Sequence, residues 1–219
     1  MSSLPAGRML LVAVLLAATS LAVAQRNINF ELLGAARSGS EASVLALLDQ
    51  GANPDSRNRL GDTPVNVAAR NGNHAIVTLL LQRSADVNLP NLARVTPLMS
   101  AAFSGHAGIV RLLVEHKADL HAVDRVQKTA LVYAAGSGHT ECVRALLDAG
   151  IDVNARYAND ATALMWAAAY GNDDTVAFLL ERGADPAARD NRGKSALTIA
   201  AEERHSATAA RLRAAAAKD

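Results

Sequence analysis

Six histidines and one cysteine are the side chains of this 219-residue chain with the widest chemical range. Imidazole nitrogens and thiolates bind transition metals and act as acids, bases or nucleophiles. His116 and His121 fall at an expected helix end and in the loop after it, and they lack the ligand spacing of a zinc site. We expect His74 and His205 to lie at the surface. The sequence therefore predicts no metal ligands.

His106 and His139 stand at equivalent positions of two similar stretches, each directly after a glycine. We therefore expect them to belong to the framework of the fold. Cys142 aligns with Ile76 and Ile109, which are expected core positions. A buried thiol at such a position behaves as a small apolar group and not as a nucleophile.

The chain contains none of the common catalytic or phosphate-binding motifs. A G-x-x-x-x-G-K-[ST] loop, a G-x-S-x-G elbow and an H-E-x-x-H pair are all absent from the sequence. We therefore predict no catalytic residue and no cofactor. An enzyme that acts on small molecules stays open as a different class of function, and an activity lost on substitution of a histidine or the cysteine would support it.

A repeat of 33 residues organises the chain. The stretch from Thr96 to Asp119 reads TPLMSAAFSGHAGIVRLLVEHKAD. Similar stretches begin at Thr63, Thr129, Thr162 and, more weakly, Ser195. The same frame fits one period further back, so it covers residues from about 29 to about 212. A fixed period of this length indicates stacked supersecondary units that form one elongated domain.

Each unit predicts two short helices and a protruding loop. A threonine caps the first helix, paired alanines let neighbouring helices approach, and a glycine ends it. The second helix has one apolar face, and helices this short depend on their neighbours for stability. Ser84 and Lys117 stand where other units have Gly51, Gly150 or Gly183. The residues after each second helix predict a hairpin-like finger.

The first 24 residues differ from the rest. An apolar run follows Arg8, and Ala22 and Ala24 fit a cleavage site of the A-x-A type. We predict a signal peptide over residues 1–24, cleaved after Ala24, and a polar linker over residues 25–29. An uncleaved membrane anchor is the alternative, but the apolar run is short for a bilayer span of ~20 residues.

Cleavage would leave a neutral chain. It removes Arg8 and no acidic residue, so the 22 basic residues become 21, against 21 acidic ones. A neutral chain is a poor candidate for general nucleic-acid binding, so we predict no nucleic-acid partner and no stable membrane insertion after cleavage. Cys142 is the only cysteine, which excludes an internal disulfide.

The recurring residues resemble the ankyrin repeat. In one unit they are Thr96-Pro97-Leu98, Ala101-Ala102, Gly105-His106, Ile109-Val110, Leu112-Leu113 and Ala118-Asp119. The resemblance implies an all-α solenoid of about six stacked helix-turn-helix units, counting polar N- and C-terminal caps. The domain would span residues 25–219, with units near 29–61, 62–94, 95–127, 128–160, 161–193 and 194–219.

One position departs from the family pattern. The histidine that follows Thr-Pro-Leu in the family, and bonds to the threonine, is replaced here by Asn66, Met99, Val132, Met165 and Thr198. We expect that hydrogen bond to be absent, with no change of fold.

The resemblance also implies protein binding through the fingers and first helices, on a concave face. Positions that differ between units fall there, and aromatic and arginine residues dominate binding hot spots. Our partner-binding candidates are Arg59, Arg70, Arg94, Phe103, Arg125, Lys128, Tyr133, Tyr157, Trp166 and Tyr170. Other variable positions include Leu60, Asp62 and Leu92. Five of the seven aromatic residues are candidates, and we expect the other two, Phe30 and Phe178, in the core.

The sequence thus predicts a non-enzymatic scaffold that binds another protein. The signal peptide favours a bacterial periplasmic location, with secretion as the alternative. An exported effector of a host protein and a chaperone-like stabilising subunit of an exported enzyme stay open. Nothing in the sequence indicates self-association, so we expect a monomer.

Overall fold

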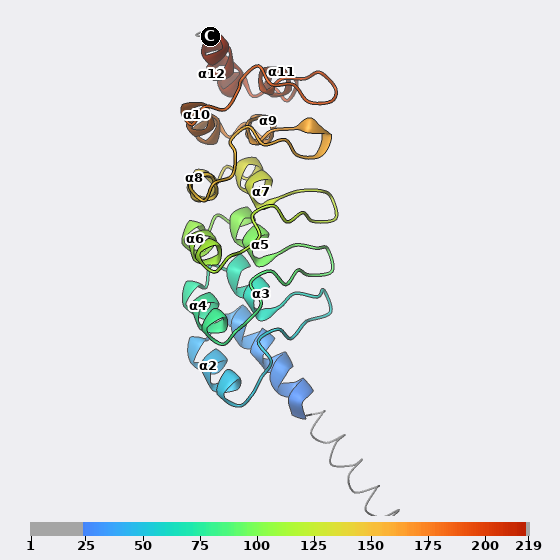
Figure 1. Cartoon of the computed structure of the whole chain (residues 1–219), viewed down its shortest axis with the longest axis vertical. Helices are drawn as coiled ribbons and strands as arrows, with labels where there is room; N and C mark the ends of the chain where they lie inside the picture. Colours follow the sequence, from blue (N-terminus) through green and yellow to red (C-terminus); the bar gives the residue numbers. More distant parts are fainter. Residues whose placement is uncertain (1–23, 218–219) are drawn as a thin grey trace, which may run out of the picture.

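The computed structural model describes residues 24–217, which form six helix pairs stacked in one direction (Figure 1). The helices are residues 24–38, α2 (Glu41–Asp49), α3 (Pro64–Arg70), α4 (His74–Gln82), α5 (Pro97–Phe103), α6 (Ala107–Glu115), α7 (Ala130–Gly136), α8 (Thr140–Asp148), α9 (Ala163–Ala169), α10 (Asp173–Glu181), α11 (Ala196–Glu202) and α12 (Ser206–Ala216), with a 3-10 turn η1 (Ala158–Asp160). No strand occurs among these residues, so the predicted all-α solenoid is confirmed.

The stack has two layers of helices and a row of loops. One layer consists of first helices, of which α3, α5, α7, α9 and α11 pack on one another in that order. The other layer consists of the second helices α2, α4, α6, α8, α10 and α12. Five loops project beyond the first helices (Figure 1). We call them fingers one to five: residues 57–62, 90–95, 123–128, 156–161 and 189–194. The fingers and the first helices together form what we call the finger face.

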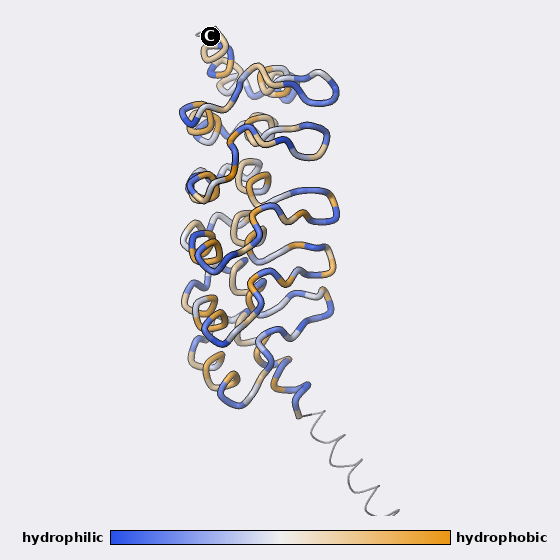
Figure 2. Tube along the Cα trace, viewed as in Figure 1, coloured by the Kyte–Doolittle hydropathy of each residue, from blue (hydrophilic) through white to orange (hydrophobic). Residues whose placement is uncertain are grey.

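Small and branched apolar residues fill the space between units. The paired alanines of the first helices have no exposed surface: Ala68, Ala69, Ala101, Ala102, Ala134, Ala135, Ala167 and Ala168. Because alanine has a single side-chain carbon, adjacent helices can lie close together. The second helices contribute buried valines and leucines, and Figure 2 shows hydrophobic residues along both helix layers. Burial between neighbours is the main favourable term in this fold.

Threonine hydroxyls cap the first helices as predicted. Thr63 Oγ1 accepts from the backbone N–H of Asn66 at 3.2 Å, and the threonines that begin α5, α7 and α9 accept in the same way. The histidine bond to this threonine is absent as expected, but in one unit another side chain makes a bond to it. There the Asn66 amide donates to Thr63 Oγ1 at 3.4 Å and to the carbonyl of Leu89 at 2.9 Å. An asparagine thus replaces the histidine as a donor.

A side chain just before each second helix from α4 to α12 ties its unit to the preceding one. His106 Nε2 lies 3.1 Å from the carbonyl oxygen of Arg70, and His139 Nε2 lies 3.0 Å from that of Phe103. A ring nitrogen facing a carbonyl must carry the proton and donate. Asn73, Asn172 and His205 bond to carbonyls of the preceding unit in the same way. We call this set the inter-unit clasps.

The clasps explain the glycine that ends each first helix. Gly105 has a φ of +81°, and a Cβ there would lie 2.7 Å from the ring of His139. Glycine is therefore required both by its backbone conformation and by the approach of the next unit. The last unit has Arg204 at this position, with a φ of 63°. No further unit follows it in the described residues, so only the conformational cost remains.

The N-terminal end differs from its prediction at two points. Residues 25–29, expected as a linker, are helical, and the Asn29 side chain accepts from the backbone N–H of Asn53 at 2.7 Å. Phe30 is 76% exposed and not in the core, whereas Phe178 is buried as expected. The predicted signal peptide lies outside the described residues except for Ala24. Between residues 24 and 217, no helix has the length and apolar character needed to cross a bilayer.

We predict that Ser84→Gly and Lys117→Gly each stabilise the protein. Both residues adopt a positive φ, 63° and 66°, where a side chain costs roughly 1 kcal/mol relative to glycine. Each variant should raise the Tm by about 2–4 °C in thermal unfolding followed by circular dichroism. The control Ser104→Gly, at a φ of −90°, should give no increase. A Tm that stays the same or falls in both variants would contradict this account of the two positions.

A second prediction separates the clasp from backbone conformation. Gly105→Ala and Gly183→Ala both place a side chain at positive φ, +81° and +84°, but only the first meets another residue within 4 Å. Gly183→Ala should cost roughly 1 kcal/mol of unfolding free energy. Gly105→Ala should cost about 1–3 kcal/mol more, because the His139 ring must move. Urea unfolding measures both, and equal losses would show that the His139 contact imposes no constraint.

Candidate functional site

Five of the candidate residues form one cluster on the finger face. The Phe103 and Tyr133 rings meet edge to face with centroids 5.6 Å apart, and the Trp166 and Tyr170 rings stack at 6.4 Å with 13° between their planes. Phe103 ends α5, Tyr133 lies on α7 and Trp166 on α9, so three consecutive units contribute. With Lys128 of finger three, these residues make up what we call the aromatic cluster.

Lys128 joins the two ring pairs. Its Nζ lies 4.7 Å from the centroid of the Trp166 ring and 5.5 Å from that of Tyr133. An ammonium at these distances is attracted by the negative face of the ring, with roughly 0.5–2 kcal/mol at stake depending on solvation. The lysine head is thereby held at the centre of the cluster, where the rings displace part of its water.

Tyr133 has a framework role in addition to its place in the cluster. Its hydroxyl donates to Oδ2 of Asp124, whose side chain is buried at the base of finger three. Burial, and then the hydrogen bond to this carboxylate, raise the pKa of Tyr133 well above the usual range, so the phenol stays neutral. The other oxygen of Asp124 accepts from the N–H groups of Val126 and Lys128. Tyr133 therefore fixes finger three as well as lining the cluster.

The rings of Trp166 and Tyr170 carry no such framework bonds. Trp166 Nε1 is the one buried side-chain nitrogen or oxygen without a hydrogen-bond partner in the described part of the chain. Tyr170 is 56% exposed, as is Phe103. Exposed aromatic rings of this size that neighbour one another are unusual on a surface without a binding role.

The surface around the cluster is hollowed in three adjoining places. The first hollow, of about 360 Å³, lies between Leu60 and Tyr133, and the second, of about 140 Å³, lies over Lys128. The third, of about 450 Å³, extends from Trp166 to Glu203. The first and second share Phe103 and Tyr133, and the second and third share Trp166. We call these three adjoining hollows the groove of the finger face.

Tyr157 is a candidate that the structure does not bring to the cluster. It occupies the position at which the other fingers have Asn58, Asn91, Asp124 and Asp190, whose side chains accept two backbone N–H groups of their own finger. Tyr157 is half-buried, and burial raises its pKa to about 12. Finger four consequently takes a different path, with the 3-10 turn η1 and a positive φ at Asn159, in addition to the positive φ that every finger has at the position of Asp160.

The arginine candidates fall into two groups. Arg70 is paired with Asp62 at 2.9 Å, and that carboxylate is buried. Arg59, Arg94 and Arg125 lie exposed on fingers one, two and three, and their guanidinium groups have no ion pair or hydrogen bond with residues 24–217. Exposed apolar side chains accompany them: Leu60, Leu92 and Val126. Sequence reasoning missed Val126, although its alignment with Leu60 in the repeat could have identified it.

Three of the histidines and the cysteine have structural roles. His106 and His139 are clasps, as expected, and His74 is exposed; His205 was expected at the surface but is a half-buried clasp. Cys142 is completely buried in the core, and burial raises the pKa of its thiol to about 11. Among residues 24–217, no three histidine, cysteine, aspartate or glutamate side chains are close enough to hold a metal ion.

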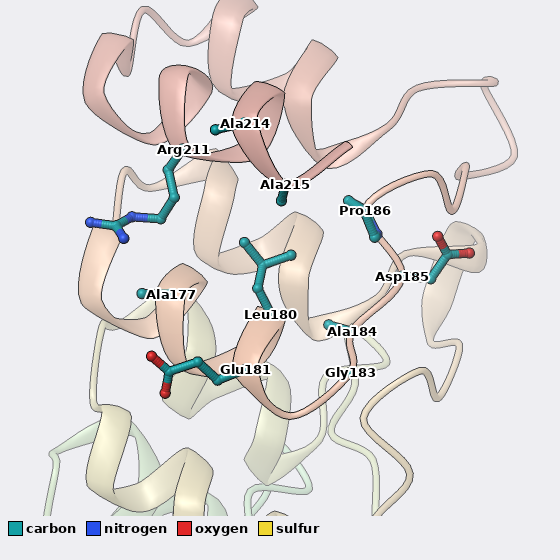
Figure 3. Close-up of a pocket in the computed structure, with 10 residues that line it drawn as sticks. All are labelled: Ala177, Leu180, Glu181, Gly183, Ala184, Asp185, Pro186, Arg211, Ala214 and Ala215. Atoms are coloured by element: carbon teal, nitrogen blue, oxygen red, sulfur yellow. The ribbon is translucent and has the colours of Figure 1, made fainter. Parts of the chain in front are cut away.

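A larger hollow of about 690 Å³ lies elsewhere, between α10 and α12 (Figure 3). Its lining is mostly small, including Ala177, Ala214 and Ala215, and it holds no aromatic ring. Arg211 at its rim is already paired with Asp173 at 2.6 Å. This hollow is therefore a weaker candidate for recognition than the groove on the finger face.

Comparison with known families gives an independent assignment. The family model described as "Ankyrin repeats (3 copies)" matches four overlapping stretches, residues 32–124, 86–157, 122–190 and 157–218. These stretches cover nearly all of the described chain. No curated protein shows significant similarity to the chain. Ankyrin repeats generally mediate protein–protein interaction and are typically non-catalytic. The chain belongs to the ankyrin repeat family.

Proposed function

We propose that this protein is a non-enzymatic scaffold that binds another protein on its finger face, with the partner seated in the groove over the aromatic cluster. The observation that carries the proposal is the convergence of Phe103, Lys128, Tyr133, Trp166 and Tyr170 from three units on one groove. Aromatic side chains in a hollow surrounded by polar residues are typical anchors of protein interfaces.

The remaining candidates fit the same role with different contributions. Arg59, Arg94 and Arg125 would contact the partner from the finger tips. Arg70 and Tyr157 would act indirectly, since one is paired with Asp62 and the other is half-buried in its finger. A catalytic role has less support, because the buried thiol and the clasp histidines each have a structural function.

We propose that the protein is exported, on the basis of the signal peptide predicted over residues 1–24. Residues 25–219 would then form one domain with the six repeat units predicted from the sequence. The protein would then act in the periplasm or, alternatively, in the secreted fraction. An effector of a host protein and a stabilising subunit of an exported enzyme are special cases of the same binding function. Cell fractionation separates the first from a periplasmic protein, because an effector appears outside the producing cell. A monomer is proposed, with no nucleic-acid partner.

We predict that the double variant Trp166→Ala/Tyr170→Ala loses its partner in affinity capture from the exported fraction. Removal of two clustered aromatic anchors typically costs 2 kcal/mol or more, which is about a 30-fold loss of affinity. The control is Phe30→Ala, which removes an aromatic ring that is 76% exposed but belongs to the helix of residues 24–38, outside the three units that form the aromatic cluster. Thermal unfolding should show that both variants fold.

The same partner recovered equally well by the double variant and the wild type would show that the aromatic cluster is not the binding site. A loss with the Phe30→Ala control instead would move the site to the N-terminal end of the stack.

A further inference from the structure

The fingers carry far more positive than negative charge. Their five segments hold nine basic residues: Arg57, Arg59, Arg94, Arg125, Lys128, Arg156, Arg189, Arg192 and Lys194. They hold four acidic ones, of which Asp62, Asp124 and Asp190 are buried at 2%, 3% and 6% exposure. Asp160 is thus the only exposed carboxylate of the fingers. A chain that is close to neutral overall presents a positive edge on the side where the groove lies.

Five of these nine basic side chains already have a hydrogen-bond or ion-pair partner within the protein. The guanidinium groups of Arg57, Arg156 and Arg189 donate to backbone carbonyls of the fingers. Arg192 pairs with Asp190 at 2.7 Å, and Lys194 pairs with Glu202 at 2.5 Å.

Four cations are left without such partners among the described residues: Arg59, Arg94, Arg125 and Lys128. All four belong to fingers one to three. The basic residues without such partners are therefore confined to three of the five fingers.

Apolar side chains alternate with these four cations. Leu60 follows Arg59, and Val126 follows Arg125; the two apolar residues are 65% exposed. Leu92, on finger two, is 57% exposed. Finger two is bonded to finger one through the Leu92 N–H and the Leu60 carbonyl, and finger three to finger two through the Arg125 N–H and the Ala93 carbonyl. These bonds hold the backbones of the three fingers side by side next to the groove.

We propose that the partner presents an acidic segment with apolar residues between its carboxylates, and that this segment lies across fingers one to three and the aromatic cluster. This inference rests on the proposed function and names the chemistry that the groove recognises. A carboxylate of the segment pairs with Lys128, whose ammonium the Trp166 and Tyr133 rings hold in place and partly shield from water. Further carboxylates pair with the arginines at the finger tips, and the apolar residues of the segment cover Leu60, Leu92 and Val126. Complementary charge of this kind sets register and specificity.

The experiment uses the purified protein and two fluorescein-labelled peptides of 12 residues. One intersperses Glu and Leu with Ser, and its twin has Gln in place of every Glu. A 12-nucleotide single strand of dT tests the nucleic-acid alternative. Fluorescence anisotropy should show the Glu peptide binding at least tenfold more tightly than the Gln twin and the oligonucleotide, and more weakly as salt rises from 50 to 300 mM.

Matched triple variants test where the charge acts. Arg94→Gln/Arg125→Gln/Lys128→Gln should weaken binding of the Glu peptide tenfold or more. The control Arg111→Gln/Lys117→Gln/Arg213→Gln removes the same net charge from exposed positions of the second-helix layer and should leave the affinity within about twofold.

Three results would overturn the proposal: equal binding of the two peptides, tighter binding of the oligonucleotide than of the Glu peptide, or equal effects of the two triple variants. The proposed function is tested separately, because it depends on Trp166 and Tyr170. The two proposals separate if a natural partner is lost with those two substitutions but retained by the finger triple variant. That result would support the scaffold function and contradict the proposal that the partner binds through an acidic segment.

Discussion

Contact between successive units is the constraint on which the rest of the structure depends. Apart from the first helix, over residues 24–38, the helices have seven to eleven residues and cannot bury an apolar face alone, so each unit is covered by its neighbours. The fully buried alanines set how closely the first helices approach, and the clasp side chains close that approach with hydrogen bonds to the preceding unit. Because these contacts lie inside the stack, the side chains of the finger face can vary without loss of fold.

At each end of the finger row an ion pair joins a finger to its first helix, whereas the middle of the row has no such pair. Where each finger meets its first helix, the first unit of the row has the pair Asp62–Arg70, and the last has Lys194–Glu202, with the charges reversed. At the corresponding positions between them, Lys128 faces Gly136, which offers no charge. Ion pairs with an exposed partner add little stability, so their main effect here is on the electrostatic character of the surface. They leave Lys128 available at the centre.

Features that follow from the position of a residue within the repeat could be predicted from the sequence. The threonine caps, the buried thiol of Cys142 and the strained Ser84 are of this kind, because local backbone chemistry decides them. Phe30 was misplaced because its unit has no described neighbour on that side to cover it. His205 was misjudged although it occupies the repeat position of His106 and His139, so the same alignment could have identified it as a clasp. Tyr157 lies apart from the aromatic cluster because it occupies the position of a framework asparagine or aspartate in its finger. The ring-to-ring distances of the aromatic cluster depend on the rotation between units, which no residue pattern specifies.

Net charge conceals how the charges are distributed. The second helices from α2 to α12 carry eight acidic and four basic residues, whereas the fingers carry nine basic and four acidic ones, three of them buried. The molecule is therefore polarised across its width, and such a field orients an approaching acidic partner towards the fingers. Neutrality of the whole chain consequently does not by itself exclude a nucleic acid. The apolar residues that alternate with the free cations of fingers one to three are what favour a protein segment, because a phosphate backbone offers nothing to cover Leu60, Leu92 and Val126.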